Sequence, residues 1–135
     1  MNRTDKPDNL AARLVRALGD LTALELLYTD DVVFHLPSSL VDDAIRGKAN
    51  VMAMHRQVWT SIYHPVVEVE ILDTLAQDSL SAARFVYRAR FKSTNEAYQN
   101  EYTFFVRGRE GMISEVFEGV DSHRFVQLRP SVADA

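Results

Sequence analysis

The sequence predicts an α+β domain in which helices cover one face of a curved, mainly antiparallel sheet. In the first half of the chain, hydrophobic residues recur at helical spacing around a single strand. From Val66 onward, apolar and polar residues alternate with the period of strands. Helices followed by a run of antiparallel strands are typical of α+β domains, and such a sheet, closed by helices, tends to enclose an apolar pocket.

The composition indicates one compact domain. The chain has 135 residues, of which 47% are hydrophobic and 25% charged. We expect a single domain at 1–128 and a flexible tail at 129–135. The absence of cysteine excludes disulfides and thiolate nucleophiles. A net charge of −4 without a basic cluster argues against nucleic-acid binding. No apolar run approaches the roughly 20 residues of a membrane span, so the default expectation is a cytoplasmic protein.

Three helices are predicted before the sheet. Asp8 is the expected N-cap of a helix at 10–18, and Asp20 that of a second at 21–28. Apolar residues at helical spacing predict a longer third helix at 48–61. A helical turn is expected at 121–128.

The strands follow from β-branched and aromatic runs bounded by turn residues. A proline closes the earliest of them, and a loop is expected between it and the third helix. The predicted strands are 32–37, 66–76, 80–92, 97–107 and 113–121.

Glu115 and Glu118 lie on the last predicted strand. Side chains alternate along a strand, so these two carboxylates face opposite sides. Glu118 shares its predicted face with Ser114, Val116 and Val120, and Glu115 shares the other with Ile113 and Phe117. Both faces carry apolar residues, so the pattern alone leaves open which carboxylate lies inside.

Three segments together resemble SnoaL-like proteins of the nuclear transport factor two-like superfamily. They are Gly19–Pro37, the glycine at position 47 before the long helix, and Glu110–Asp121. The resemblance covers most of residues 9–125. It implies a cone-shaped, cystatin-like α+β barrel in which three helices pack in the concavity of the sheet. It also implies a homodimer through the outer sheet face, for which Ile113 and Phe117 are the expected apolar contacts.

The resemblance assigns the site residues one by one. Leu36 stands where ketosteroid isomerases carry their proton-shuttling aspartate, and Phe34 and Leu36 stand where epoxide hydrolases hold water. Ala12 replaces the isomerase tyrosine, while Tyr102 matches the oxyanion-hole aspartate and keeps a donor. Glu118 matches a catalytic aspartate of epoxide hydrolases, which favours Glu118 as the inward carboxylate. Because Leu36, Phe34 and Ala12 lack the polar groups of these relatives, ketosteroid isomerisation and epoxide hydrolysis are not expected.

A carboxylate inside an apolar cavity has a raised pKa and can act as a general acid or base. The catalytic candidates are Glu118, Tyr102 with Asn100 as hydrogen-bond donors, and His55 as a second proton carrier. The alternative is a Glu118 near the rim, paired with an arginine or an amide, and a merely structural His55. The predicted ligand-binding residues, which could equally be core, are Tyr28, Phe34, Leu36, Met54, Trp59, Asn100, Phe104, Val116 and Val120.

These residues predict a cavity protein for a small hydrophobic ligand. It would be an isomerase, cyclase or dehydratase that uses no cofactor; the alternative is a non-catalytic ligand-binding or protein-interaction member of the same fold. The four histidines lack short ligand spacing, so no metal site is expected. His35 is predicted to face outward, and His64 and His123 could border the cavity mouth. Arg84, Arg88 and Arg90 are expected to bind acidic residues on neighbouring strands or on a partner subunit.

Overall fold

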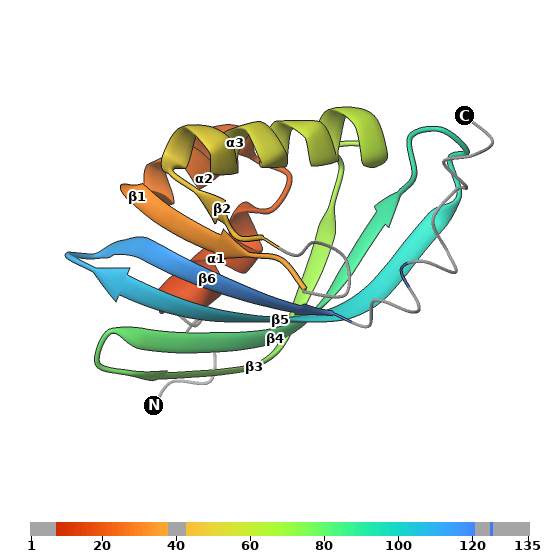
Figure 1. Cartoon of the computed structure of the whole chain (residues 1–135). Helices are drawn as coiled ribbons and strands as arrows, with labels where there is room; N and C mark the ends of the chain where they lie inside the picture. Colours follow the sequence, from red (N-terminus) through yellow and green to blue (C-terminus); the bar gives the residue numbers. More distant parts are fainter. Residues whose placement is uncertain (1–7, 38–42, 121–124, 126–135) are drawn as a thin grey trace.

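The computed structural model describes residues 8–37, 43–120 and Phe125, and it has the predicted α+β architecture (Figure 1). The predicted tail and the helical turn at 121–128 lie outside these residues, Phe125 excepted. The α-helices are α1 (Leu10–Ala17), α2 (Leu21–Leu27) and α3 (Lys48–Gln57), and α3 continues into a π-helical turn at Val58–Ile62. The strands are β1 (Tyr28–His35), β2 (Ile45–Arg46), β3 (Glu68–Gln77), β4 (Leu80–Arg90), β5 (Ala97–Arg109) and β6 (Met112–Val120).

The strands form one mixed sheet in the order β2-β1-β6-β5-β4-β3. The meander from β3 to β6 is antiparallel, whereas β1 pairs with β6 in parallel. In the part of the chain that the structure describes, β2 and β3 are the edges, so the sheet is strongly curved but open. The expected barrel is therefore not closed.

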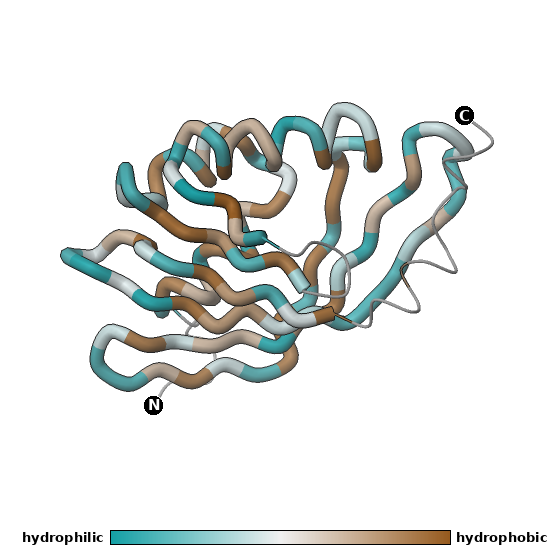
Figure 2. The backbone as a smooth tube through the Cα atoms, viewed as in Figure 1, coloured by the Kyte–Doolittle hydropathy of each residue, from teal (hydrophilic) through white to brown (hydrophobic). Residues whose placement is uncertain are grey.

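The helices cover the concave face of the sheet and bury the core there (Figure 1). Each strand contributes alternate side chains, as the alternating colours along the strands show (Figure 2). On β5, for example, Tyr98 and Phe104 are buried while Gln99 and Phe105 are exposed. The largest fully buried side chains are Tyr28, Tyr98, Phe34, Phe85, Phe91 and Phe104. An aromatic core thus fills the concavity.

The first half of the chain differs from the prediction at three points. Asn9, not Asp8, caps α1, because its Oδ1 accepts a hydrogen bond from the Ala12 amide at 2.8 Å while Asp8 pairs with Arg13. Tyr28 begins β1 instead of ending α2, since parallel pairing with β6 extends the strand backward. The short strand β2 lies within the expected loop and pairs with β1. The last two differences come from strand pairing between residues distant in sequence.

A β-bulge at Ser114 changes the side-chain pattern of β6. Arg107 pairs with Glu115 and Gly108 with Ile113, which leaves Ser114 as the extra residue. The Ser114 hydroxyl donates to the Arg107 carbonyl at 3.1 Å. Ile113 is consequently turned into the core and is fully buried, so its predicted outer-face position is wrong. Ser114, predicted to face the cavity, serves the bulge instead.

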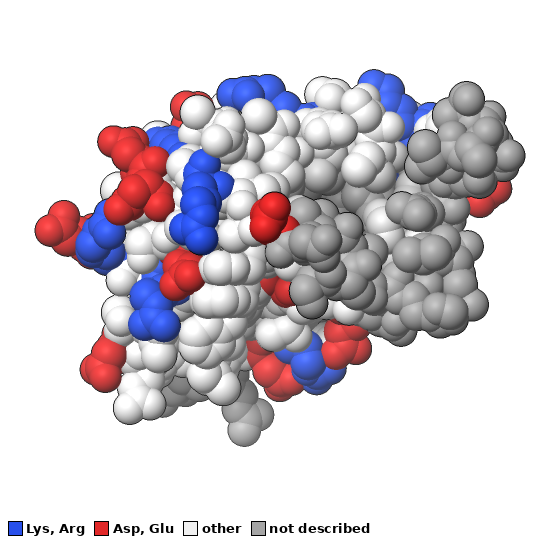
Figure 3. Space-filling view, viewed as in Figure 1, with Lys and Arg blue, Asp and Glu red and all other residues white. Residues whose placement is uncertain are grey.

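The outer face of the sheet carries ion pairs and a small aromatic patch. Arg84 binds Asp73 and Glu101, and Arg88 binds Glu70, which confirms the predicted pairing for these two arginines. Arg90 instead donates to the Asn95 carbonyl at 2.9 Å. Phe105 and Phe117 remain 38% and 39% exposed. Basic and acidic groups are interspersed on the face shown in Figure 3. Among the described helices, none is long and apolar enough to cross a membrane.

Candidate active site

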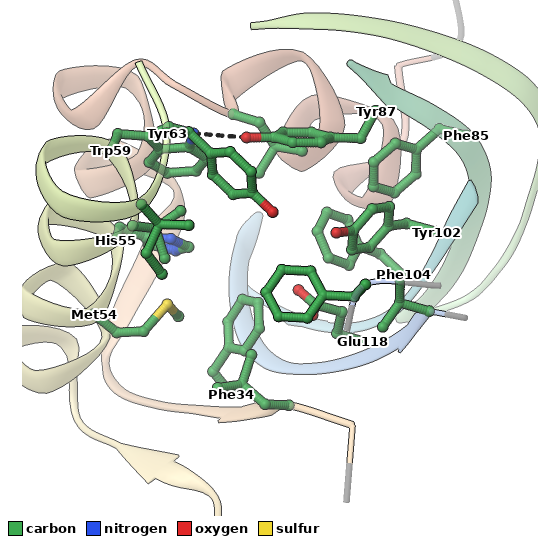
Figure 4. A pocket seen from close by; sticks show the side chains of 16 residues that line it. Phe34, Met54, His55, Trp59, Tyr63, Phe85, Tyr87, Tyr102, Phe104 and Glu118 are labelled. Atoms are coloured by element: carbon green, nitrogen blue, oxygen red, sulfur yellow. Dashed lines mark hydrogen bonds between the residues drawn. The ribbon is translucent and has the colours of Figure 1, made fainter. Parts of the chain in front are cut away.

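A cavity of about 330 Å³ lies between α3 and the concave face of the sheet (Figure 4). The helical side contributes Leu18 and residues of α3 and the π-helical turn; the sheet side contributes residues of β4, β5 and β6. The described lining residues are Leu18, Phe34, Leu36, Met54, His55, Val58, Trp59, Ile62, Tyr63, Phe85, Tyr87, Tyr102, Phe104, Glu118, Val120 and Phe125. The wall is mostly aromatic and aliphatic with a few polar groups, the usual composition of a small-molecule site.

Local periodicity brings these side chains together. Met54, His55, Val58, Trp59 and Ile62 recur at intervals of one, three and four residues, so they share one face of the helical segment. Each strand directs every second side chain inward, and the bulge at position 114 leaves Glu118 on the same face as the buried core. The two patterns converge on one apolar space.

Glu118 is the acidic residue among the described lining residues of the cavity. Its side chain points into the cavity between Phe34 and Phe104 (Figure 4). Among the described residues, no group forms a hydrogen bond or ion pair with its carboxylate. Burial without a compensating partner raises the pKa of Glu118 to about 7. Near neutral pH the group therefore exists in both protonation states and can accept or donate a proton.

Three tyrosine hydroxyls also belong to the cavity wall. Those of Tyr63 and Tyr102 point toward its interior (Figure 4), and Tyr87 accepts a hydrogen bond from Trp59 Nε1 at 2.9 Å. Burial raises the pKa of Tyr63, Tyr87 and Tyr102 above the ordinary range, and the Glu118 charge adds to this. The hydroxyls stay protonated and can serve as neutral hydrogen-bond donors.

His55 lies on the helical wall and is held on several sides. Its Nε2 lies 2.7 Å from the Tyr28 hydroxyl, and its ring stacks against Tyr28 and Trp59. Phe34 contacts it edge-on, with 5.6 Å between ring centroids. Burial lowers the pKa of His55 to about 4, so the imidazole is neutral at neutral pH. A neutral, hydrogen-bonded ring can orient a ligand, but it is a poor acid.

The structure brings together most of the residues that the sequence singled out. Glu118, Tyr102, His55, Phe34, Leu36, Met54, Trp59, Phe104 and Val120 all line the cavity. Tyr28, Val116 and Asn100 do not contribute to its wall. Tyr28 and Val116 are fully buried, and Tyr28 supports His55 from behind.

Asn100 is placed differently from the expectation that it donates directly to an oxyanion. The hydroxyls of Tyr98 and Tyr102, on either side of it in sequence, lie 2.8 Å apart, and the Asn100 amide donates to Tyr98 at 3.0 Å. Asn100 therefore contacts the cavity wall through a tyrosine hydroxyl.

Some wall residues were not predicted. Phe85 and Tyr87 share the buried face of β4, and this alternation in the sequence was the available signal. Tyr63 follows the last helical residue, where no periodic pattern in the sequence marks it. Its ring packs against those of Tyr87 and Tyr98 in the folded protein. Leu18, Val58 and Ile62 complete the helical wall.

The remaining histidines lie away from the cavity or outside the described residues. His35 faces outward as predicted. Its ring stacks on that of Phe117, with 4.2 Å between centroids, and its Nε2 lies 2.7 Å from Glu115 Oε2. His64 is not part of the cavity wall; its amide donates to the Arg90 carbonyl. His123 lies outside the described residues. Within those residues, no three acidic or histidine side chains are grouped as a metal site requires.

Residues 11–116 match the family model of the SnoaL-like domain. The chain belongs to the SnoaL-like family. No curated protein sequence matches it. The family match covers the helices, β1 to β5 and the first part of β6, so it includes most of the cavity wall but stops before Glu118.

Solved structures show the same fold at low sequence identity. A proposed isomerase from Rhodopseudomonas palustris has a TM-score of 0.75 and 17% identity, covering 90% of this chain and 96% of its own. IdmH, a proposed polyketide cyclase from Streptomyces antibioticus, has a TM-score of 0.70 and 22% identity, covering 87% and 94%.

A third similar structure, from Catenulispora acidiphila DSM 44928, has a ketosteroid isomerase-like fold and is in complex with trimethylamine. Its TM-score is 0.71 at 14% identity, covering 84% of this chain and 86% of its own. At such identities the likeness concerns the fold, whereas chemistry depends on the individual side chains.

Proposed function

We propose that this SnoaL-like protein is a cofactor-independent isomerase, cyclase or dehydratase that moves a proton on a small hydrophobic molecule. The observation that carries the proposal is Glu118: an unpaired carboxylate in an aromatic cavity, with a pKa raised to about 7. Such a group is close to the optimum for general acid–base work near neutral pH. The proposed cyclase and isomerase with the same fold are consistent with this class of reaction.

The proposed reaction begins with ionised Glu118. One carboxylate oxygen takes a proton from a carbon next to a carbonyl, and the electron pair of the broken C–H bond moves onto the carbonyl oxygen. Tyr102 donates a hydrogen bond to that developing oxyanion, which stabilises it in an apolar surrounding. Protonated Glu118 then returns the proton to another atom of the substrate. Isomerisation, ring closure and loss of water all start with this same proton removal.

The electrostatics of the wall favour an uncharged substrate. Among its described residues there is no lysine or arginine, and His55 is neutral. An anionic ligand would meet Glu118 without any compensating cation, and that desolvation is costly. A neutral molecule with one or two oxygens, otherwise apolar, suits the cavity best.

Titration of Glu118 tests the proposal directly. We expect its side-chain carbon, followed by carboxyl NMR, to titrate with a pKa near 7. Glu118→Gln should slow proton transfer by about 100-fold to 10,000-fold while ligand affinity is kept. The readout is exchange of the α-protons of acetophenone in heavy water.

Glu115→Gln is the matched control, because it removes the same charge from the outer face of the same strand. It should leave the exchange rate nearly unchanged. A Glu118 that titrates at the ordinary pKa of a glutamate, or a Glu118→Gln variant with wild-type exchange, would contradict the proposal.

A non-catalytic ligand carrier is the second candidate, and one observation favours it. Trp59, Tyr63, Tyr87 and Tyr102 surround a space that also holds one unpaired carboxylate, Glu118. Aromatic faces attract small ammonium cations, and the carboxylate would neutralise one. The similar structure in complex with trimethylamine points to the same chemistry.

Trimethylamine binding separates the two candidates. Trp59 is the single tryptophan of the chain and lines the cavity, so its fluorescence reports on occupancy. A carrier should bind trimethylammonium and lose that affinity in Glu118→Gln, without catalysing exchange of any carbonyl compound. An enzyme for neutral substrates should catalyse proton exchange of a carbonyl compound and should not bind trimethylammonium.

We also propose that the protein forms a homodimer through the outer sheet face. Phe105 and Phe117 supply exposed apolar surface there, with ring centroids 6.3 Å apart, and ion pairs flank them. Phe117→Asp should convert the dimer to a monomer in light scattering at micromolar concentration. A wild-type protein that is already monomeric would contradict the dimer.

A further inference from the structure

The Asn100 side chain has an orientation that its neighbours determine. Its Oδ1 accepts a hydrogen bond from the Glu101 amide at 2.8 Å. A backbone N–H can only donate, so the atom facing it must be the oxygen, and the amide nitrogen must face the other way. That nitrogen, Nδ2, lies 3.0 Å from the Tyr98 hydroxyl oxygen. Asn100 is therefore the donor and Tyr98 the acceptor.

The next hydrogen bond, between the Tyr98 and Tyr102 hydroxyls, can run in either direction, and the Asn100 donor is compatible with donation by Tyr98. The Tyr98 hydroxyl oxygen accepts the hydrogen bond from Asn100, and the Tyr98 hydroxyl proton is still available for donation. The Tyr102 hydroxyl lies 2.8 Å away and can accept it. Tyr102 then has its own proton left for a further acceptor. Donation in that direction gives a chain of bonds from Asn100 through Tyr98 to Tyr102.

Only the last member of this chain reaches the cavity. Tyr98 and Asn100 are 1% and 4% exposed and lie outside the wall, whereas Tyr102 lines it and points inward (Figure 4). Curvature of β5 makes the contact possible, because hydroxyls four residues apart on a flat strand would not meet. The Tyr63 hydroxyl borders the same space and interacts with Tyr98 and Tyr102, through side-chain hydrogen bonding as well as charge.

We propose that Asn100 and Tyr98 are positioning residues that orient Tyr102 as a hydrogen-bond donor to the ligand. The cavity then selects molecules that present an acceptor oxygen, such as a ketone or ester carbonyl, at Tyr102. Successive donors in a chain polarise one another, so Tyr102 donates more strongly than an isolated tyrosine. This inference rests on the proposed function in one respect: the cavity holds a small neutral ligand.

Asn100→Asp reverses the chain and is the decisive variant. Aspartate keeps an oxygen for the Glu101 amide but replaces the donor nitrogen by an acceptor. Tyr98 must then donate to residue 100 and accept from Tyr102, which turns the Tyr102 proton away from the cavity. Affinity for a carbonyl ligand should fall about 10-fold to 100-fold.

The probe is a series of para-substituted acetophenones, whose carbonyl oxygens differ in basicity but little in shape. Binding is followed by Trp59 fluorescence. In the wild type, affinity should rise with the basicity of the oxygen. The dependence should vanish in Tyr102→Phe, and vanish or change sign in Asn100→Asp. A residue that only supports the fold would lower all affinities equally.

Two further variants keep the test clear. Gln99→Glu adds the same negative charge one residue away, on the outer face, and should retain the wild-type dependence. Tyr98→Phe interrupts the chain without adding charge, so it should weaken the dependence and lower affinity about threefold to tenfold. A wild-type dependence in both Asn100→Asp and Tyr98→Phe overturns the proposal, as does failure of every acetophenone to bind the wild type.

A measurement on the free protein needs no ligand. The chain has five tyrosines, so all Cζ carbons can be followed after ¹³C labelling. Asn100→Asp should shift the resonances of Tyr98 and Tyr102 and leave that of Tyr28 unchanged, whereas an unchanged Tyr102 overturns the chain. Glu118→Gln should keep the acetophenone dependence; if that dependence is as expected but Glu118 moves no proton, only the proposed function fails.

Discussion

Two carboxylates three positions apart on β6 illustrate how differently the faces of one sheet behave. Glu115 lies on the outer face, where it binds His35 at 2.7 Å and Arg107 at 3.4 Å. Glu118 lies on the inner face, in an aromatic cavity and without such partners among the described residues. The same side chain is thus part of an ordinary surface network in one place and a cavity carboxylate with a raised pKa in the other.

The two faces stabilise their polar groups in different ways. The outer face uses complementary charges in water, where ion pairs are weak and replaceable. On the inner face, several polar groups of the described residues are hydrogen-bonded to one another: Trp59 to Tyr87, His55 to Tyr28 and Tyr102 to Tyr98. Low dielectric surroundings strengthen these bonds and perturb Glu118.

The largest effect on stability is expected from adjacent phenylalanines that face opposite sides of β5. Phe104 is 2% exposed and packs against Phe85, with 4.9 Å between ring centroids, whereas Phe105 is 38% exposed. Phe104→Ala should lower the free energy of unfolding by about 3–4 kcal/mol, and Phe105→Ala by about 1 kcal/mol. Urea denaturation measures both. Equal losses of unfolding free energy in the two variants would show that the inner and outer faces of β5 do not differ in packing.

The pH dependence of stability should reveal Glu118 next. Its pKa is raised from 4.5 to about 7 by folding, so the folded state holds the proton more tightly. The resulting stabilisation is fully present below the unfolded pKa and is lost as the pH rises through the folded pKa. As the pH rises from the unfolded to the folded pKa, the free energy of unfolding of the wild type should fall by about 2–3 kcal/mol relative to that of Glu118→Gln.

The measurement is urea denaturation of wild type and Glu118→Gln at about pH 5 and about pH 8, where the difference between the two proteins isolates this group. Glu115→Gln again provides the outer-face control on the same strand. A Glu118→Gln variant whose stability follows the wild type at both pH values would show that the carboxylate is well solvated.

The smallest effect is expected for Arg84 on the outer face. It binds Asp73 at 2.7 Å and also Glu101, but its side chain is 48% exposed. Water and salt screen such pairs, so Arg84→Met should leave the urea midpoint nearly unchanged, and high salt should remove any remaining difference. A large decrease in the urea midpoint would mean that the surface ion pairs contribute as much to stability as the aromatic core.

Prediction from the sequence succeeded where the structure is locally periodic. Helical spacing located Met54, His55 and Trp59 on one face, and strand alternation placed Tyr102 and Phe104 on another. It failed where one residue breaks the period. The bulge at Ser114 reverses the side on which Ile113 lies, since an extra residue shifts every earlier position on the strand.

The sequence by itself determined the order of helices and strands, the apolar faces that must be buried, and the resemblance that favoured Glu118 over Glu115. Tertiary structure decided what those faces enclose. Parallel pairing of β1 with β6 depends on contacts between residues distant in sequence. The alternation of β4 gave a signal for Tyr87, but no periodic pattern marked Tyr63 as part of the wall. Alternation also placed Asn100 on the inner face without showing that its amide donates to Tyr98 instead of a ligand, because that depends on how the side chains pack.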